Sequence, residues 1–339
     1  MIRRRPLILV TGSSGHIGAN LVRALLQRGN SVRALVHVDE TALQGLDVET
    51  VRGDITDESS LVPVLHGVDV LYHSAAYVSV SGSERETMWQ RNVEGTRNIV
   101  RGCIRNGVTR LIHFSSIHAI ADVGAEAVID EESPLVTGRG AAPYDRSKAE
   151  SERIVLNAAR EGLNAVVVAP TAVLGPHDYR PSHFGRVLLA LARGHMPVIV
   201  EGGYDWVDVR DVVDGAIASA DDAPAGSKFM LSGNWCSFST IAQLIGEVRG
   251  CRSPRVCLPS RVAQATGTLN EAFCRARGIE ALFTRYSVGA LSSHRNVSHD
   301  KATRELGYKP RALRETIADT LRWFEVSGYL TSCQSGNET

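Results

Sequence analysis

The residues best suited to chemistry in this sequence are a tyrosine and a lysine four positions apart. Tyr144 and Lys148 occur in the run Tyr-Asp-Arg-Ser-Lys, and on a helix both side chains would leave one face about one turn apart. A phenol normally ionises at about pH 10, but a neighbouring ammonium favours the ionised form. The spacing therefore predicts a tyrosine that exchanges protons. Such pairs also occur by chance on solvated helices, so the surrounding motifs decide what this one means.

A glycine-rich turn near the N-terminus predicts a site for a phosphate-containing group. Three glycines follow the short apolar run at residues 7–10 and open an amphipathic segment at residues 17–28. Glycine permits a tight turn and close approach, and the N–H groups at the start of the helix face an anion. A purely structural turn is the alternative. We expect a dinucleotide to contact Gly12, Ser14, Gly15, His16, Ile17 and Gly18.

The first 170 residues alternate short apolar runs with amphipathic segments. The expected strands are residues 7–10, 31–37, 48–51, 69–73, 110–114 and 164–169. The expected helices are residues 17–28, 59–66, 86–106 and 144–161. Strict alternation predicts a parallel sheet covered on both faces, joined by right-handed crossovers. This is the pattern of a doubly wound α/β (Rossmann) fold, which would bind NAD(P) over residues 1–170.

After Pro170 the alternation stops. A turn-rich connection at residues 175–181 leads into helical patterns at residues 184–193, 209–220, 239–248 and 313–324, mixed with short strands. We expect a smaller, mixed α/β lobe over residues 171–330, interleaved with the core and supplying the substrate side of a cleft. Residues 331–339 are expected to form a flexible tail.

Composition narrows the possible partners. Lys plus Arg and Asp plus Glu both total 37, so no net charge attracts nucleic acid or an anionic membrane. No window approaches the roughly 20 apolar residues of a membrane span. The six cysteines are scattered without a Cys-x-x-Cys, which is typical of reduced thiols rather than disulfides or zinc ligands. We expect a cytoplasmic protein that binds no metal, nucleic acid or membrane.

The end of the second expected strand bears on the choice between NAD and NADP. A carboxylate there would bind the free ribose diol of NAD, but Val36 and His37 hold the strand end and Asp39 lies beyond them. Arg33 and His37 could offer positive charge to a 2′-phosphate, which favours NADP. The alternative is that Arg33 is a surface residue and Asp39 turns back to the ribose.

Loops after the third and fourth expected strands complete the predicted cofactor site. The run at residues 53–57 could place the Asp54 carboxylate or a backbone group near the adenine amine. The small residues Ser74, Ala75 and Ala76 would let the backbone run beneath the cofactor. Each of these segments, taken alone, would be an ordinary loop.

The motifs in this order resemble the extended short-chain dehydrogenase/reductase family, within the NAD-dependent epimerase/dehydratase superfamily, over nearly the whole chain. They are residues 11–18, 53–57, 72–76, 92–96, 114–116, 144–148, 169–176, 206–212 and 306–310. Ser115-Ser116 and the run at residues 32–36 look most like the dihydroflavonol reductase-like group. Residues 170–193 also resemble sugar epimerases associated with hopanoid genes. The chain departs from the usual pattern at Asp208, where histidine is usual, and at His37, where plant members carry arginine.

The resemblance implies specific roles. Ser116 would hydrogen-bond the substrate carbonyl, Tyr144 would pass the proton, and Lys148 would hold the nicotinamide ribose while shifting the pKa of Tyr144. The resemblance also implies a homodimer formed through residues 86–106 and 144–161. The remaining cofactor contacts that it implies are Asp54, Ile55, Ala75 and Ala76 beside the adenine and ribose, Asn92, and Pro170 and Val173 near the carboxamide.

Two absences bear on the reaction. Ala169 and Ala172 stand where sugar-nucleotide enzymes usually carry Arg and Asn for the diphosphate, and Ile117-His118 stand where dehydratases carry Asp-Glu. Both favour an NAD(P)H-dependent carbonyl reductase or alcohol dehydrogenase acting on a ketone or aldehyde of medium size. A nucleotide-sugar epimerase or dehydratase with tightly bound NAD, a 3β-hydroxysteroid-type dehydrogenase and a non-catalytic cofactor sensor are the alternatives.

Aromatic and imidazole side chains are the candidates for the substrate pocket, although packing between lobes is the alternative for each of them. Arg180 could bind an acidic substrate group or cap a surface turn. The predicted substrate contacts are Tyr77, His118, Tyr179, His183 and Trp206.

Overall fold

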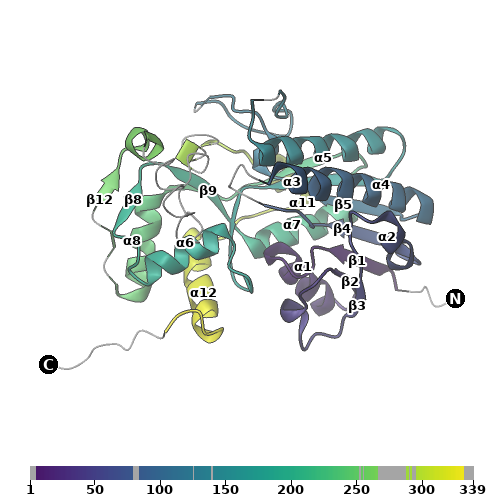
Figure 1. Ribbon diagram of the computed structural model, residues 1–339, viewed down its shortest axis with the longest axis horizontal. Coiled ribbons are helices and arrows are strands. Elements are labelled where there is room, and N and C mark those ends of the chain that lie inside the picture. The colour runs from purple at the N-terminus through teal and green to yellow at the C-terminus, as the bar shows by residue number, and fades with distance from the viewer. Residues whose placement is uncertain are drawn as a thin grey trace.

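The computed structural model places a large sheet with its helices beside a smaller lobe (Figure 1). It describes residues 5–78, 84–124, 126–138, 140–251, 253–254, 256–265, 288–289, 291 and 295–331. Apart from residue 331, the segment expected to be a flexible tail lies outside the described residues.

A seven-stranded parallel sheet confirms the predicted doubly wound fold. Its order is β10-β6-β5-β4-β1-β2-β3, and every neighbouring pair is parallel. The order reverses between β1 and β4, and a dinucleotide binds at such a switch point, outside the carboxyl ends of the strands. The strands are β1 (Leu7–Thr11), β2 (Ser31–Val36), β3 (Glu49–Arg52), β4 (Val70–His73), β5 (Arg110–Phe114), β6 (Ala165–Pro170) and β10 (Lys228–Leu231).

Helices cover both faces of this sheet. Residues of α1 (His16–Gln27) and α7 (Val209–Asp222) share one apolar core with the strands, and residues of α2 (Glu58–Leu65), α4 (Gly95–Asn106) and α5 (Pro143–Arg160) share another. The single helix expected over residues 86–106 is instead α3 (Arg85–Trp89), a π-helical turn (Gln90–Glu94) and α4. Such π-turns are frequent at functional sites.

The smaller lobe is built mainly from residues beyond Pro170. Its three-stranded sheet has the order β11-β9-β7, and β12 pairs with β8. Yet two elements that also follow Pro170 are part of the large domain: β10 pairs with β6 in the large sheet, and α7 packs against that sheet. The chain therefore leaves the large sheet at residue 170 and returns to it. The elements outside that sheet are β7 (Ala172–Leu174), α6 (His183–Ala192), β8 (Val198–Val200), β9 (Gly203–Asp208), β11 (Asn234–Ser237), α8 (Phe238–Arg249), β12 (Val256–Leu258), α11 (Asp300–Leu306) and α12 (Leu313–Val326).

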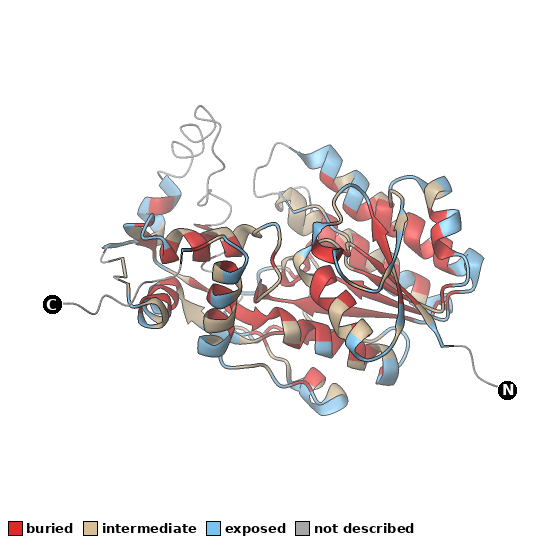
Figure 2. Cartoon of the chain, turned by 90° about the horizontal axis from the view of Figure 1, so that it is seen from below, coloured by how far each residue is buried: buried red, intermediate tan, exposed pale blue. Residues whose placement is uncertain are grey.

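Burial follows this architecture. Figure 2 shows the buried residues gathered along the central strands and on the inward faces of the helices. Among the described residues, no helix is both long enough and apolar enough to cross a membrane. The same residues hold no group of three or more His, Cys, Asp and Glu side chains that could bind a metal ion.

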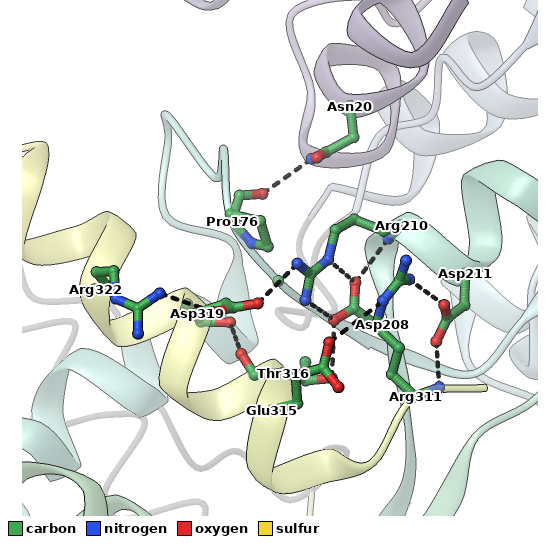
Figure 3. Close-up of polar contacts among 12 residues, drawn as sticks. Asn20, Pro176, Asp208, Arg210, Asp211, Arg311, Glu315, Thr316, Asp319 and Arg322 are labelled. Atoms are coloured by element: carbon green, nitrogen blue, oxygen red, sulfur yellow. Dashed lines mark hydrogen bonds and ion pairs between the residues drawn. The ribbon is translucent and has the colours of Figure 1, made fainter.

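A network of charged side chains joins α12 to the start of α7 (Figure 3). Asp208 caps α7 by accepting a hydrogen bond from the backbone N–H of Arg210 at 2.8 Å. The Arg210 guanidinium pairs with Asp208 and with Asp319 of α12, each at 2.7 Å. The Thr316 hydroxyl, also from α12, donates to Asp208 at 2.8 Å. Asp208 therefore holds these two helices together.

Candidate active site

The end of β5 brings together the three predicted catalytic residues. Lys148, on α5, donates from Nζ to the carbonyl oxygen of Phe114, the last residue of β5, at 2.6 Å. Ser116 lies two residues after β5, and its side chain interacts with that of Tyr144, one turn before Lys148 on α5. The helix starts here because Pro143 occupies its first turn, where a missing N–H costs nothing.

Burial dominates the proton affinities at this site. It raises the pKa of Tyr144 to about 12, although the hydrogen bond with Ser116 acts in the opposite direction. Burial also lowers the pKa of Lys148 to about 8, against the opposing effect of Glu152. The expected lowering of the Tyr144 pKa is therefore outweighed by desolvation in this structure. At neutral pH the phenol carries its proton and the lysine its charge, which suits a proton donor beside a cation.

Asn92 connects the loop after β4 to the catalytic helix. It lies in the π-helical turn, where its side chain accepts from Tyr77 N at 2.6 Å and donates to Tyr77 O at 2.9 Å. It also donates to the hydroxyl of Ser147, which itself donates to the carbonyl of Tyr144. Asn92, predicted from the sequence as a cofactor contact, thus links the backbone of Tyr77 through Ser147 to the carbonyl of Tyr144.

The glycine-rich turn forms a cradle that fits a pyrophosphate. Gly12 has φ +67°, and a Cβ there would lie 2.6 Å from the backbone nitrogen of Ala75. A Cβ on Gly18 would lie 2.1 Å from the carbonyl oxygen of Gly12. Gly15 begins α1 without a side-chain cap, and the first turn holds no acidic residue. The N–H groups of that turn therefore suit an anion.

The predicted residues near the end of β2 fall into two groups. His37 lies 3.3 Å from Asp54, and both side chains are exposed beyond the strand ends. Burial alone would raise the pKa of Asp54, but hydrogen bonds from Thr56 outweigh it and the pKa is lowered. Arg33, by contrast, donates to the carbonyl oxygens of residues 64 and 66 and pairs with residue 49. Its guanidinium is held near the end of α2, not at the end of β2.

The other predicted cofactor residues lie at or beyond carboxyl ends of strands. Ser74 and Ala76 follow β4, Ile55 follows β3, Pro170 ends β6, and Val173 lies in β7. The Ser74 hydroxyl donates to the carbonyl of Thr11 at 2.7 Å. Ile17 packs against the core beneath α1.

Comparison with known proteins identifies this combination of fold and site. Residues 8–231 match the model of the NAD dependent epimerase/dehydratase family. The chain belongs to that family. It is 36% identical over 326 residues to sterol demethylase protein B of Methylococcus capsulatus, covering 95% of this chain and 99% of that protein. It is 31% identical over 329 residues to a putative dihydroflavonol 4-reductase of Synechocystis, covering 95% of both chains.

Solved structures agree with this placement in the epimerase/dehydratase family. The crystal structure of gox2253 matches with a TM-score of 0.83 and 32% identity, over 96% of this chain and 99% of that one. The structure of MoeE5 in complex with UDP-glucose and NAD matches with a TM-score of 0.73 and 25% identity, over 94% and 99%. The resemblance predicted from the motifs is confirmed, and the fold is that of an NAD-dependent family.

One face of α1 contacts the segment at residues 175–181, which the sequence analysis did not predict. His16 Nε2 lies 3.2 Å from the carbonyl oxygen of Gly175 and 3.1 Å from that of Pro176. Asn20 donates to the same Pro176 oxygen at 2.9 Å, as Figure 3 shows. Arg23 donates to the Tyr179 hydroxyl at 2.7 Å. The polar spacing i, i+4, i+7 on an otherwise apolar helix was the signal that could have revealed this contact.

The same segment reaches the loop that follows β2. Arg180 Nε lies 2.7 Å from the Asp39 carboxylate, which also accepts hydrogen bonds from Thr41. The Ser14 hydroxyl, in the glycine-rich turn, donates to the backbone carbonyl of Asp39 at 2.5 Å. Asp39 is thus engaged by Arg180 rather than turned freely toward a ribose.

The predicted substrate residues separate into those near Tyr144 and those that pack elsewhere. The His118 ring meets the Tyr144 ring edge-on with centroids 5.4 Å apart, and its Nδ1 lies 3.1 Å from Asp145. Tyr179 packs edge-on against Trp323 of α12. Trp206 is 1% exposed and donates to the carbonyl of Cys236 at 3.0 Å. Packing, the alternative named above, thus describes Tyr179 and Trp206.

His183 and Tyr77 complete the set. His183 begins α6 and meets Phe184 edge-on, and burial lowers its pKa to about 4. Tyr77 lies beneath the Arg91 guanidinium, 5.0 Å from the ring centroid, and its backbone is held by Asn92.

Proposed function

We propose that this member of the epimerase/dehydratase family is an NAD(P)-dependent carbonyl reductase or alcohol dehydrogenase. The observation that carries the proposal is the meeting of the Ser116 and Tyr144 side chains, with the Lys148 ammonium, which donates to the Phe114 carbonyl, one helical turn from Tyr144. A hydroxyl, a protonated phenol and a buried cation are the groups that convert a carbonyl oxygen into an alcohol.

The dinucleotide would be held by the glycine cradle and the start of α1, and when bound it supplies the hydride. Ser116 orients the carbonyl oxygen of the substrate by a hydrogen bond. Tyr144 donates its phenolic proton to that oxygen. Lys148 stabilises the phenolate that this transfer leaves, because an ammonium nearby favours the charged form of the phenol.

The substrate class is proposed from two considerations. Ala169 and Ala172 are buried alanines and offer no polar side chain to a nucleotide diphosphate. Relatives include a 4-hydroxy-2-methyl-3-oxo-4-farnesyl-3,4-dihydroquinoline-1-oxide ketoreductase of Stigmatella aurantiaca and a 3-beta-hydroxysteroid dehydrogenase of Mycolicibacterium neoaurum. We therefore propose a largely apolar ketone or secondary alcohol of polycyclic or prenylated size.

NADP is the proposed cofactor, in preference to NAD. The Asp39 carboxylate is paired with Arg180 and Thr41, which disfavours its use on a free ribose diol. A 2′-phosphate near this carboxylate would find Arg180, Ser14 and His37 as partners. Arg33 is not among them, because its donors are used elsewhere.

The test is a panel of cyclic and prenylated ketones with NADPH and NADH, followed by cofactor absorbance. We expect Tyr144→Phe to lower kcat by about 10²–10⁴-fold, the usual contribution of a general acid, with cofactor affinity unchanged. Tyr72→Phe is the matched control, since Tyr72 is buried in the core beneath α1 and α7. Purified protein that carries tightly bound NAD and oxidises neither cofactor with any carbonyl would refute the reductase in favour of an epimerase.

A further inference from the structure

A buried cluster lies beside the catalytic residues and plays no part in the mechanism described above. Glu152, on α5, has a fully buried side chain, and its Oε1 lies 2.7 Å from Nζ of Lys228 on β10. Its Oε2 accepts a hydrogen bond from the Ser115 hydroxyl at 2.5 Å. A carboxylate is costly to bury without partners, and this one has two.

We propose that Glu152, held by Ser115 and Lys228, is a positioning residue that keeps Lys148 charged and Ser116 aligned with Tyr144. The proposal rests on the function proposed above. It adds a carboxylate and a second lysine to the groups that govern the reaction, and both act through Lys148 rather than on the substrate.

The alignment follows from helix geometry. Lys148 and Glu152 are four residues apart on α5, so they share a face. They bind consecutive residues at the end of β5, since Lys148 reaches the Phe114 carbonyl and Glu152 reaches the Ser115 hydroxyl. The next residue is Ser116. The backbone that carries the substrate-binding hydroxyl is thus fixed to the helix that carries the proton donor.

The electrostatic role follows from the other charged or titratable groups around Lys148. These are Tyr144 and Glu152 on α5, His113 on β5 and His73 on β4, and Glu152 is itself paired with Lys228 on β10. Burial, with a smaller contribution from Lys148, lowers the pKa of His73 to about 3 and that of His113 well below its usual value. Both imidazoles are therefore neutral at pH 7. Among these groups, Glu152 alone supplies negative charge that holds the proton on Lys148.

Amino-acid usage supports a specific role for the lysine pair. The chain contains 37 Lys and Arg residues, yet its lysines are only Lys148, Lys228, Lys301 and Lys309. Lys228 pairs with the buried Glu152 carboxylate, and Lys148 lies four residues before Glu152 on α5 and feels its charge. Lysine presents a compact charge whose pKa responds to burial, whereas arginine remains charged, so lysine at these two positions suits a site whose charge balance matters.

The two ends of the ion pair give opposite predictions. Glu152→Gln removes the negative charge that favours the protonated form of Lys148, so the pKa of Lys148 should fall. Lys228→Met leaves the whole carboxylate charge to Lys148, so that pKa should rise. Each shift should be about one unit, the lower end of what a neighbouring charge produces. A purely structural residue would lower activity in both variants without shifts of opposite sign.

The experiment measures kcat/KM of the full-length protein from about pH 5.5 to about pH 10. Because Lys148 has a lower pKa than Tyr144, the alkaline limb reports on the lysine. We expect this limb to move down by about one pH unit in Glu152→Gln and up by about one in Lys228→Met. Glu150→Gln, which alters a half-exposed carboxylate on the same helix, should leave it unmoved. Ser115→Ala should lower kcat without moving the limb.

A second readout does not depend on activity. With lysine labelled by ¹³C at Cε, the four lysines give four signals, and Lys148→Met assigns the one of interest. Its titration should show the same opposite shifts. If either single variant fails to fold, the double variant Glu152→Gln/Lys228→Met replaces the ion pair by neutral groups. The pKa of Lys148 in this double variant should differ from the wild-type value by less than about one unit. Shifts of the same sign, or none, would overturn the proposal. Opposite NMR shifts in a protein that reduces no carbonyl would instead overturn the proposed function.

Discussion

Replacement of Asp208 by alanine should weaken the attachment of α12 to the rest of the chain. The Asp208 side chain is fully buried and accepts hydrogen bonds from Arg210 and from the Thr316 hydroxyl. Three losses contribute. The missing cap costs about 1 kcal/mol, the orphaned Thr316 hydroxyl about 1 kcal/mol, and the lost half of the Arg210 pairing about 1 kcal/mol, because Arg210 is partly exposed and keeps Asp319.

The expected result is a free energy of unfolding lower by about 3 kcal/mol, the sum of these three contributions. Urea unfolding followed by fluorescence measures it. Asp208→Asn has a single acceptor oxygen, so it can keep the cap from Arg210 N but places an amide NH2 where the Thr316 hydroxyl now finds a carboxylate oxygen. It should therefore cost less than Asp208→Ala but remain destabilising. Arg322→Ala provides a control at the exposed edge of the same network (Figure 3), where Arg322 pairs with Asp319. It should change stability by less than about 0.5 kcal/mol.

The same variant predicts a pH dependence. Burial alone would raise the pKa of Asp208, but hydrogen bonds from Arg210 outweigh it and the pKa is lowered. A carboxyl whose pKa is lowered in the folded state stabilises the protein at pH values above its unfolded-state pKa. This stabilisation is lost as the pH falls through the folded-state pKa. The difference between wild type and Asp208→Ala should therefore be full at pH 7 and shrink below about pH 4. If the free energies of unfolding of wild type and Asp208→Ala differ by less than about 1 kcal/mol at pH 7, or if the difference grows in acid, this account of the network is refuted.

Three further predictions concern the cofactor and the core. Gly18→Ala should abolish measurable cofactor binding in a fluorescence titration, because the new Cβ would lie 2.1 Å from the Gly12 oxygen; Gly140→Ala, with open space around its Cβ, should not. Arg180→Gln should lower the ratio of NADPH to NADH affinity about tenfold in calorimetry, the loss of one charge-assisted hydrogen bond; an unchanged ratio would remove Arg180 from the phosphate site. Trp206→Ala should lower the free energy of unfolding by about 3–5 kcal/mol, whereas a substrate contact would raise KM at unchanged stability.

Local patterns were enough to predict the large sheet and the proximity of Tyr144 and Lys148 on one helix. Short apolar runs and period-3.6 amphipathic segments located the strands and helices to within a few residues, since each depends on neighbours along the chain. The glycine turn was predictable because only glycine fits φ +67° against the backbone at Ala75. Tyr144 and Lys148 were predictable because one helical turn sets their distance. The π-helical turn at Asn92 was not, since it depends on Tyr77, 15 residues earlier.

The protonation state of the site could not be predicted from spacing. Helical geometry puts Lys148 beside Tyr144 and predicts a lowered phenol pKa, but the depth of burial decides the direction, and burial raises it. That depth is set by strands and helices far apart in the sequence. Lys228, on β10, reaches Glu152 across 76 residues because β10 pairs with β6.

The proposed role of the smaller lobe in cofactor selection rests on the same kind of distant contact. Cofactor preference is usually read at the end of the second strand, and by that criterion the missing acid, together with Arg33 and His37, predicted NADP. In the folded chain Asp39 is paired with Arg180, 141 residues later, and its backbone carbonyl is bound by Ser14 of the phosphate turn. His16, Asn20 and Arg23 hold the segment that carries Arg180 against α1. A bound 2′-phosphate would therefore compete with the Asp39 carboxylate for the Arg180 guanidinium, which the smaller lobe supplies. Altering residues 175–181 should then change both the cofactor preference and the attachment of the smaller lobe to α1.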